Sequence, residues 1–228
     1  MCTISGLTGA VAGTHLMCDG GWKDYIRYVN EQKGGFKGKN GTVIVKNISY
    51  DSEYKADKAK EMFARAKAAG VIAHSHCASA HSDQLLPDYE AAKVPLITGS
   101  PGVASMWSDW LYASIHTGAY NMGRTYVKWR YDVWTKAGKP GGTLKLSSLA
   151  ADVPFTPIVL YEVEAFAKSL DPNIEMTVEM YPPAATDVTA QASRLKAKGV
   201  ESVFGTCPPD QTAMSVKSMR RAGFDLTK

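Results

Sequence analysis

Four side chains that could bind a metal ion fall within a single stretch of eight residues: His74, His76, Cys77 and His81. If this stretch begins as a β-strand, alternation places His74 and His76 on one face, and imidazole with thiolate is a ligand set that suits zinc. Structural zinc sites, however, usually draw their ligands from two separated elements, and no carboxylate that would orient the imidazoles is obvious. The pattern therefore favours polar residues that line a ligand-binding loop, with a metal-dependent enzyme as the weaker alternative.

Nucleophilic catalysis is a second possibility for this stretch, with Cys77 or Ser79 activated by a nearby histidine. The chain lacks a GxSxG motif, which would hold a serine at a sharp strand-to-helix turn. Two glycine-containing segments, TGAVAG (8–13) and GSPGVAS (99–105), lack the lysine of a phosphate-binding loop and the spacing of a dinucleotide-binding fingerprint. We therefore expect neither an enzyme nor a bound cofactor.

Non-covalent binding of a small zwitterion is a third possibility. The run VIAHS (71–75) predicts a buried strand, and HCASAHSD (76–83) predicts a polar loop that leads into a helix. Ser82 or Asp83 could cap that helix. A helix that begins where a strand ends attracts anions, because unpaired N–H groups and the helix dipole meet there.

The donors for such a ligand would be Ser79 and the N–H groups near His81. The next predicted strand is VPLIT (94–98), and the turn after it could supply acceptors from Gly102 to Ser105. Ordinary strand–helix loops also contain such residues, so their placement after successive strands is what makes the site a candidate.

The elements that position these residues alternate between strand and helix along the whole chain. Strands are predicted at 42–48, 110–115 and 174–181, and a helix should open at Asp51 or Ser52. Further helices are predicted over 120–137 and 157–169, and GKPGG (138–142) is the strongest linker signal. This alternation predicts an α/β fold with parallel sheets. Two such series, joined near residues 118–142, predict two lobes, 1–118 and 119–228, with ligands bound at the strands' C-terminal ends.

Composition sets limits on partners and compartment. The chain has 228 residues, 45% of them hydrophobic and 21% charged, with a formal net charge of +4. No basic run with interleaved aromatics predicts nucleic-acid binding, and no stretch reaches the ~18 apolar residues of a membrane span. Residues 1–20 lack the pattern of a secretion signal. Four cysteines without CxxC spacing allow two disulfides but do not require them: Cys2, Cys18, Cys77 and Cys207.

The order of motifs resembles the type I periplasmic binding proteins, specifically the branched-chain amino-acid group of ABC importers. The matching stretches in the first half are SGLTGAVAG, YVNEQKGGFKG, ISYDSEYKADKAK and CASAHSDQLLPDYEAAKVPLITGSPGVAS. The second half adds YPPAATDVTAQASRLKAKGVESVFGT. The resemblance covers nearly the whole chain, and it rests on five stretches that occur in the family's order.

The resemblance implies two Rossmann-like lobes that meet near residues 116–120 and close on a ligand. It also implies a site lined by residues 79–81, 102–105 and 152–155. The ligand carboxylate would lie on Ser79, Ala80 and His81, and the ammonium group would lie on Gly102 with Ala104 or Ser105. The remaining contacts implied are Thr14 in the first loop and, in the second lobe, Phe155 and Cys207.

Several residues depart from the family pattern. The first loop and the turn at 206–208 lack the aromatics of the amino-acid binders. Cys77 matches a cysteine that is disulfide-bonded in some members, but the partner position near Glu53 is not cysteine, so Cys77 is expected to be a free, partly buried thiol. The acidic residue that pairs with the ammonium would lie beyond Lys228. The chain therefore resembles a fragment with an incomplete second lobe and without its return strands.

The function that this resemblance implies is capture of a small amino-acid-like or amide ligand, without catalysis, for delivery to the membrane permease of an ABC importer. We expect a monomer in the periplasm or another extracytoplasmic compartment, with the signal peptide absent from this fragment. The alternative is a ligand-sensing domain of a receptor or regulator with the same fold. A metal-dependent enzyme built on the histidine–cysteine stretch remains the weaker alternative.

Overall fold

The computed structural model describes residues 1–226 except 10, 100, 114–118, 154 and 207–208. The chain divides into two compact units, Met1–Thr117 (unit 1) and Gly118–Lys228 (unit 2). Both are built from parallel strands joined through helices, which confirms the predicted α/β class. None of the helices within the described residues combines the length and the apolar character needed to cross a membrane.

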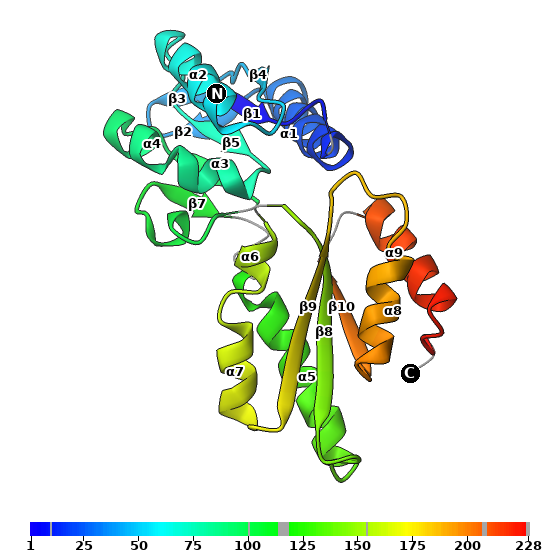
Figure 1. The fold of residues 1–228 in the computed structure, drawn as a ribbon. Coiled ribbons are helices and arrows are strands. Elements are labelled where there is room, and N and C mark those ends of the chain that lie inside the picture. The colour runs from blue at the N-terminus through cyan, green and yellow to red at the C-terminus, as the bar shows by residue number, and fades with distance from the viewer. Residues whose placement is uncertain (10, 100, 114–118, 154, 207–208, 227–228) are drawn as a thin grey trace. The chain divides into compact units, whose positions relative to one another are not determined.

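Unit 1 contains a five-stranded parallel sheet in the order β4-β1-β5-β6-β7 (Figure 1). The strands are β1 (Cys2–Ser5), β4 (Ile48–Asp51), β5 (His74–His76), β6 (Leu96–Thr98) and β7 (Leu111–Ala113). The helices are α1 (Ala12–Gln32), α2 (Ala56–Ala68), α3 (Ser79–Gln84), α4 (Leu86–Ala92) and a 3-10 turn, η1 (Ser105–Trp107). An antiparallel hairpin, β2 (Phe36–Gly38) and β3 (Gly41–Val43), follows α1.

The two faces of this sheet differ in polarity because side chains alternate along each strand. Cys2 and Ile4 of β1 belong to an apolar core shared with α2 and α4. Thr3 and Ser5 point to the opposite face and are also buried. There Ser49, which pairs with Thr3 in the sheet register, donates a 2.6 Å hydrogen bond to Asp19 of α1. One face of the sheet is therefore lined by apolar side chains, and the other also buries hydroxyl groups.

Unit 2 contains a three-stranded parallel sheet in the order β10-β8-β9 with helices on both faces (Figure 1). The strands are β8 (Leu144–Ala151), β9 (Ile174–Tyr181) and β10 (Ser202–Thr206). The helices are α5 (Ala119–Lys136), α6 (Thr156–Val159), α7 (Val163–Leu170), α8 (Thr189–Ala197) and α9 (Pro209–Arg221). One apolar cluster joins α5, α7 and the sheet, and a second joins α8 to the sheet, with α9 side chains packed against it.

The single strand predicted over 42–48 is wrong. β3 ends at Val43 and β4 begins at Ile48, with no strand between them. The reason is a side chain: the Asn30 amide bonds both backbone groups of Val45, at 2.8 Å to its carbonyl and 3.1 Å from its N–H. These backbone groups are therefore not free to join a sheet.

Three further expectations about elements also need correction. GKPGG is a turn inside unit 2, between α5 and β8, where Lys139 has φ 55° and the Trp134 indole donates to the Pro140 carbonyl at 3.0 Å. The helix predicted over 157–169 is interrupted at Glu162 (φ 51°), which separates α6 from α7. The helix expected to open at Asp51 or Ser52 begins later, at Ala56.

Candidate functional site

The predicted anion-binding loop follows β5, but its helix starts earlier than expected. α3 begins at Ser79 with Ala78 as its N-cap residue, so capping by Ser82 or Asp83 is wrong. Both side chains lie inside α3 and contact other segments. Ser82 Oγ is 3.4 Å from His76 Nε2, and Asp83 accepts a hydrogen bond from the backbone of another loop. The Ala78 carbonyl instead accepts the first helical bonds, from the N–H groups of residues 81 and 82.

Most of the predicted ligand-contacting side chains of this loop are buried within unit 1. Ser79 is 2% exposed. His81 is fully buried, with its Nε2 3.4 Å from Ser52 Oγ. Ala80, between them, is partly exposed. The surface of this loop is therefore formed by backbone and Ala80, while Ser79 and His81 support it from beneath.

The second predicted loop, residues 102–105 after β6, is folded on itself. Ser105 Oγ accepts from the Gly102 N–H at 2.8 Å and donates to the Gly102 carbonyl at 3.3 Å. The hydroxyl and carbonyl that were predicted to bind an ammonium group are thus bonded to each other. Ala104 is exposed, and it is the member of this predicted set that presents its side chain to solvent.

Asp83 joins the two loops, and sequence reasoning did not assign it a role. Its Oδ1 accepts a 2.8 Å hydrogen bond from the Ser105 N–H. A Cβ added to Gly102 would lie 2.1 Å from the Asp83 carboxylate carbon, so only glycine allows this approach. Asp83, two residues after the segment 79–81, thus lies directly against the segment 102–105.

The first turn of α1 is tied to the same region by a disulfide. Thr14, which was predicted to contact the ligand, is half-buried in this turn. Cys18, one turn further along α1, is bonded to Cys77, with 6.4 Å between their Cα atoms. The prediction that Cys77 is a free thiol is therefore wrong. Its partner, Cys18, belongs to α1 and does not lie near Glu53. The sequence held one indication of this pairing: Cys18 is four residues after Thr14, so on a helix it lies on the same side as a residue that was already predicted to be at the site.

Four histidines are buried around these loops: His15, His74, His76 and His81. The ring centres of the last three lie 5.1 and 6.0 Å apart in succession. Burial lowers the pKa of His15 and His81 to about 4 and that of His74 to about 3. Burial also lowers the pKa of His76 well below its ordinary value. All four are therefore neutral near pH 7, and they give the site no positive charge.

The histidine cluster does not form the metal site considered from sequence. Within the part of the chain that the structure describes, no three His, Cys, Asp or Glu side chains are grouped to hold a metal ion. Cys77 is also consumed by the disulfide, so it offers no thiolate. Cys2 is the free cysteine among the described residues, and burial raises its pKa to about 12.

Two predicted site residues belong to unit 2. Phe155 follows β8, is half-buried and occupies the N-cap position of α6. Cys207 and the segment 114–118 lie outside the described residues. Thr206, at the end of β10, has its hydroxyl 3.4 Å from that of Ser148 on β8. A cleft shared by the two units therefore remains a prediction.

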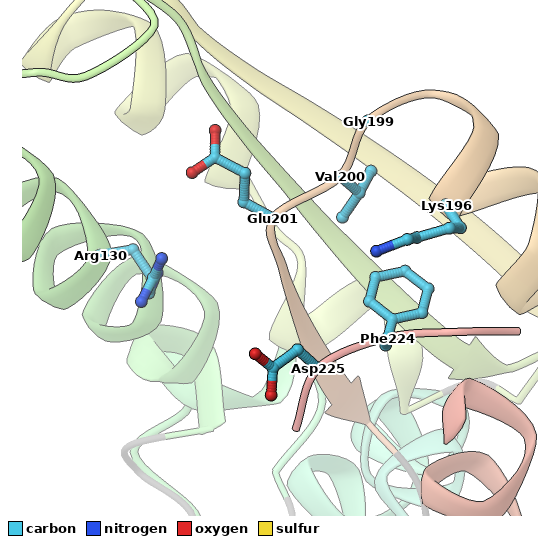
Figure 2. Close-up of a pocket in the computed structure, with 7 residues that line it drawn as sticks. All are labelled: Arg130, Lys196, Gly199, Val200, Glu201, Phe224 and Asp225. Atoms are coloured by element: carbon cyan, nitrogen blue, oxygen red, sulfur yellow. The ribbon is translucent and has the colours of Figure 1, made fainter. Parts of the chain in front are cut away.

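A pocket of about 370 Å³ lies elsewhere in unit 2 (Figure 2). Val200 and Glu201, just before β10, form one side, and the Lys196 ammonium lies 5.1 Å from the centre of the Phe224 ring. Arg130 and Asp225 complete its charged lining. Ligands of parallel α/β sheets bind at the C-terminal ends of strands. This pocket is at the opposite end of β10 and is therefore not the predicted site.

Comparison with known proteins identifies the family. Residues 3–228 match the periplasmic binding protein family. No curated protein matches the sequence. A branched-chain amino acid ABC transporter protein from Thermus thermophilus, solved with bound valine, is similar with a TM-score of 0.82 and 17% identity, over 98% of this chain and 56% of that one.

Two other solved structures have the same fold. A fatty acid ABC transporter substrate-binding protein from Thermomonospora curvata has a TM-score of 0.79 and 20% identity, over 98% of this chain and 55% of that one. An ABC transporter solute-binding protein from R. palustris in complex with benzoate has a TM-score of 0.72 and 11% identity, over 97% of this chain and 58% of that one. The chain thus spans little more than half the length of these proteins.

Proposed function

Because this chain belongs to the periplasmic binding protein family, we propose that it forms the ligand-binding part of a solute-binding protein that serves an ABC importer. The observation that carries this proposal is the joined pair of loops at the C-terminal ends of β5 and β6. Asp83 and Gly102 hold these loops together at the end of the sheet where α/β proteins bind ligands. Similar structures are described as binding valine or benzoate, or as belonging to a fatty acid transporter.

The proposed ligand is a small amino-acid-like or amide molecule. The His81 N–H already donates to the Ala78 carbonyl. The N–H groups of Ser79 and Ala80, the first two residues of α3, are the ones that a helix leaves without an intrahelical partner, and such groups favour a carboxylate or another electron-rich oxygen. The histidines around it are neutral at pH 7, so a ligand would be recognised here by hydrogen bonds and shape. Thr14, Ala80 and Ala104 are the predicted contacts whose side chains are at least partly exposed in unit 1.

The proposed partner is the membrane permease of the importer, and the proposed compartment is extracytoplasmic. The Cys18–Cys77 disulfide supports this compartment, because such bonds persist in oxidising surroundings. Phe155 and Cys207 of unit 2 are proposed to complete the site across a cleft, as in the family pattern.

The test is calorimetric titration of Ser79→Ala and the parent, both at their full natural length, with L-valine, L-leucine, acetamide and benzoate. Ser79 lies beneath the loop surface and can act on a ligand only through the loop backbone. The compound that binds the parent should therefore bind the variant more weakly by up to about ten-fold, less than the loss of a direct hydrogen bond to a charged group (~1.5–3 kcal/mol) would cause. The variant should also lose about 1 kcal/mol of stability, because the Ser79 side chain is buried.

Ser108→Ala is the matched control, because this serine lies in unit 1 and bonds to Glu90 outside the two loops. It should bind as the parent does. Equal affinity of Ser79→Ala and the parent would show that Ser79 does not contribute to the site. Absence of binding to every compound of the panel would count against an amino-acid-like or amide ligand.

A further inference from the structure

Asp51, the last residue of β4, accepts four hydrogen bonds through its side chain. Its Oδ1 accepts from the N–H groups of Leu7, Thr8 and Glu53, at 2.9, 3.3 and 2.8 Å, and its Oδ2 accepts from the Thr8 hydroxyl at 2.7 Å. Leu7 and Thr8 belong to the loop after β1, and Glu53 belongs to the turn after β4. Sequence reasoning considered Asp51 only as the start of a helix. In the structure, one carboxylate joins the segments that follow two neighbouring strands.

The sheet register explains why the loop after β1 needs this acceptor. Ser5 and Asp51 form the last pair between β1 and β4, and the Ser52 N–H donates to the Ser5 carbonyl at 2.9 Å. The Leu7 N–H also bonds back to the Ser5 carbonyl, at 3.0 Å. Beyond this pair the strand pairing stops, so the N–H groups of the loop must find acceptors other than a neighbouring strand. The Asp51 carboxylate supplies them.

The turn after β4 depends on the same carboxylate. Glu53 and Tyr54 have φ angles of 51° and 59°, in the left-handed region that side-chain-bearing residues rarely adopt. Such backbone persists only where its surroundings hold it. Asp51 accepts from the Glu53 N–H, and Ser52 Oγ accepts from the Tyr54 N–H at 3.3 Å. Side-chain bonds of this kind, to the backbone two residues on, stabilise tight turns. Asp51 therefore holds this turn and the loop after β1 in one arrangement.

The loop after β1 leads to the first turn of α1, which carries the predicted ligand contact Thr14. The Gly6 N–H donates to His15 Nδ1 at 2.9 Å, and His15 is buried in this turn. A Cβ added to Gly6 would lie 2.9 Å from the Tyr54 nitrogen, so the loop also lies directly against the turn after β4. Movement of residues 6–8 would therefore act on His15 and on its neighbour Thr14.

We infer that Asp51 is a positioning residue of the proposed site. Its carboxylate fixes the loop after β1 and, through the bond from Gly6 to His15, the first turn of α1. The inference rests on the proposed function only in naming Thr14 as a ligand contact. The bonds themselves belong to unit 1 and can be measured without a ligand. Asp51 acts through the backbone of the loop and is assigned no contact with the ligand.

The experiment is amide hydrogen exchange of the full chain without ligand, at neutral pH. The Thr8 and Glu53 amides report the bonds to Asp51. The His15 amide, which donates to the Val11 carbonyl at 3.2 Å, reports opening of the first turn of α1. Asp51→Ala removes the acceptor, and hydrogen bonds to an ionised acceptor are the stronger ones. The Thr8 and Glu53 amides should therefore exchange about ten-fold faster in this variant, and the His15 amide about three-fold faster.

Two further variants separate the placement of an oxygen from the loss of a charge. Asp51→Asn keeps one side-chain oxygen that can accept from the same N–H groups. All three reporter amides should exchange about three-fold more slowly in it than in Asp51→Ala, because a neutral oxygen is a weaker acceptor than a carboxylate but is still an acceptor. Asp24→Ala removes the same charge from an exposed position of α1, where Asp24 pairs with Arg27. It is the matched control and should change none of the three amides.

The Leu96 amide of β6, which donates to the Trp110 carbonyl at 2.8 Å, distinguishes positioning from a general loss of stability. It should exchange at the parental rate in every variant. Unchanged exchange at Thr8 and Glu53, unchanged exchange at His15, or equal acceleration at Leu96 would each overturn the inference. Exchange as fast in Asp51→Asn as in Asp51→Ala would overturn it as well. None of these outcomes bears on ligand binding, which the titration of Ser79→Ala tests separately.

Discussion

Unit 1 buries four histidines and a set of serines and threonines beneath its loops, whereas residues 118–228 contain no histidine. Unit 1 also contains the Cys18–Cys77 disulfide. Unit 2 is held by two apolar clusters around β8, in which Leu144, Leu146 and Leu149 are fully buried. Both units therefore have an apolar core, and unit 1 adds buried histidines and a disulfide to it.

The two units differ in where their buried titratable side chains lie. In unit 1 they gather where β1, β4 and β5 end, around the predicted ligand loop. Buried groups that change charge or oxidation state make stability depend on conditions, whereas apolar packing responds little to pH or to reductant. We therefore expect the two units to respond separately to acid and to reduction.

Acid should produce the largest difference. Burial lowers the pKa of these histidines in the folded protein, whereas in the unfolded chain it stays near ~6.5. Above pH ~6.5 they are neutral in both states and do not oppose folding. As pH falls from ~6.5 toward the folded-state pKa, the unfolded chain binds protons that the folded protein cannot, so stability is lost. For His15 and His81, with pKa about 4, the loss by pH 4.5 is on the order of 2–3 kcal/mol each. Hydrogen exchange of the full chain between pH 7 and 4.5, corrected for intrinsic rates, should show unit 1 opening first.

A variant of His74 tests the cause of this acid response. His74 is fully buried beside Phe63, 5.5 Å between ring centres, and within the described residues neither of its ring nitrogens has a hydrogen-bond partner. His74→Phe should therefore keep the packing and remove part of the acid response of unit 1. An acid response that is the same in His74→Phe and the parent, or that is as large in unit 2, would contradict this account.

Reduction of the disulfide should have the next largest effect. The Cys18–Cys77 bond closes a loop with a sequence separation of 59 residues, for which stabilisation of ~2–4 kcal/mol is typical. The double variant Cys18→Ser/Cys77→Ser should lower the stability of unit 1 by about this amount and leave unit 2 unchanged. The measurement is denaturant unfolding followed by residue-resolved exchange.

Cys207→Ser is the control for the cysteine variants, because this residue belongs to unit 2. It should behave as the parent does with and without reductant. An equal loss of stability in both units, or no loss on reduction, would show that the disulfide does not distinguish them.

The smallest effect concerns an ion pair of unit 2. Bonds from Arg194 and Lys198 hold the pKa of Glu179 below its usual range, so its contribution is present above the unfolded pKa and is lost as pH falls through the lower folded one. The two cations are about half exposed, so solvent screening reduces the effect. Glu179→Gln should cost under ~1 kcal/mol at pH 7, measured by thermal unfolding. A loss above 2 kcal/mol would show that polar contacts matter as much in unit 2.

The sequence by itself determined the class of fold and the order of its elements. The alternation in IEMTVEMY predicted β9 over Ile174–Tyr181, because successive side chains of a strand point to opposite faces. The alternation of strand and helix patterns indicated the parallel α/β class, and five stretches in the family's order indicated the family. The polar residues that follow the predicted strands made the loops after β5 and β6 the candidate site. Such features are readable because they depend on neighbouring residues in one element.

The tertiary structure decided which distant side chains meet. Cys77 is paired with a cysteine 59 residues earlier, and Asp83 bonds the backbone of Ser105, 22 residues later. The Tyr54 ring centre lies 5.3 Å from that of His15 and 5.6 Å from that of His81, and Glu53 and Tyr54 adopt left-handed backbone that no sequence pattern indicated. These partnerships depend on the order of strands in the sheet and on backbone held in place by groups elsewhere, so no periodicity in the sequence reports them.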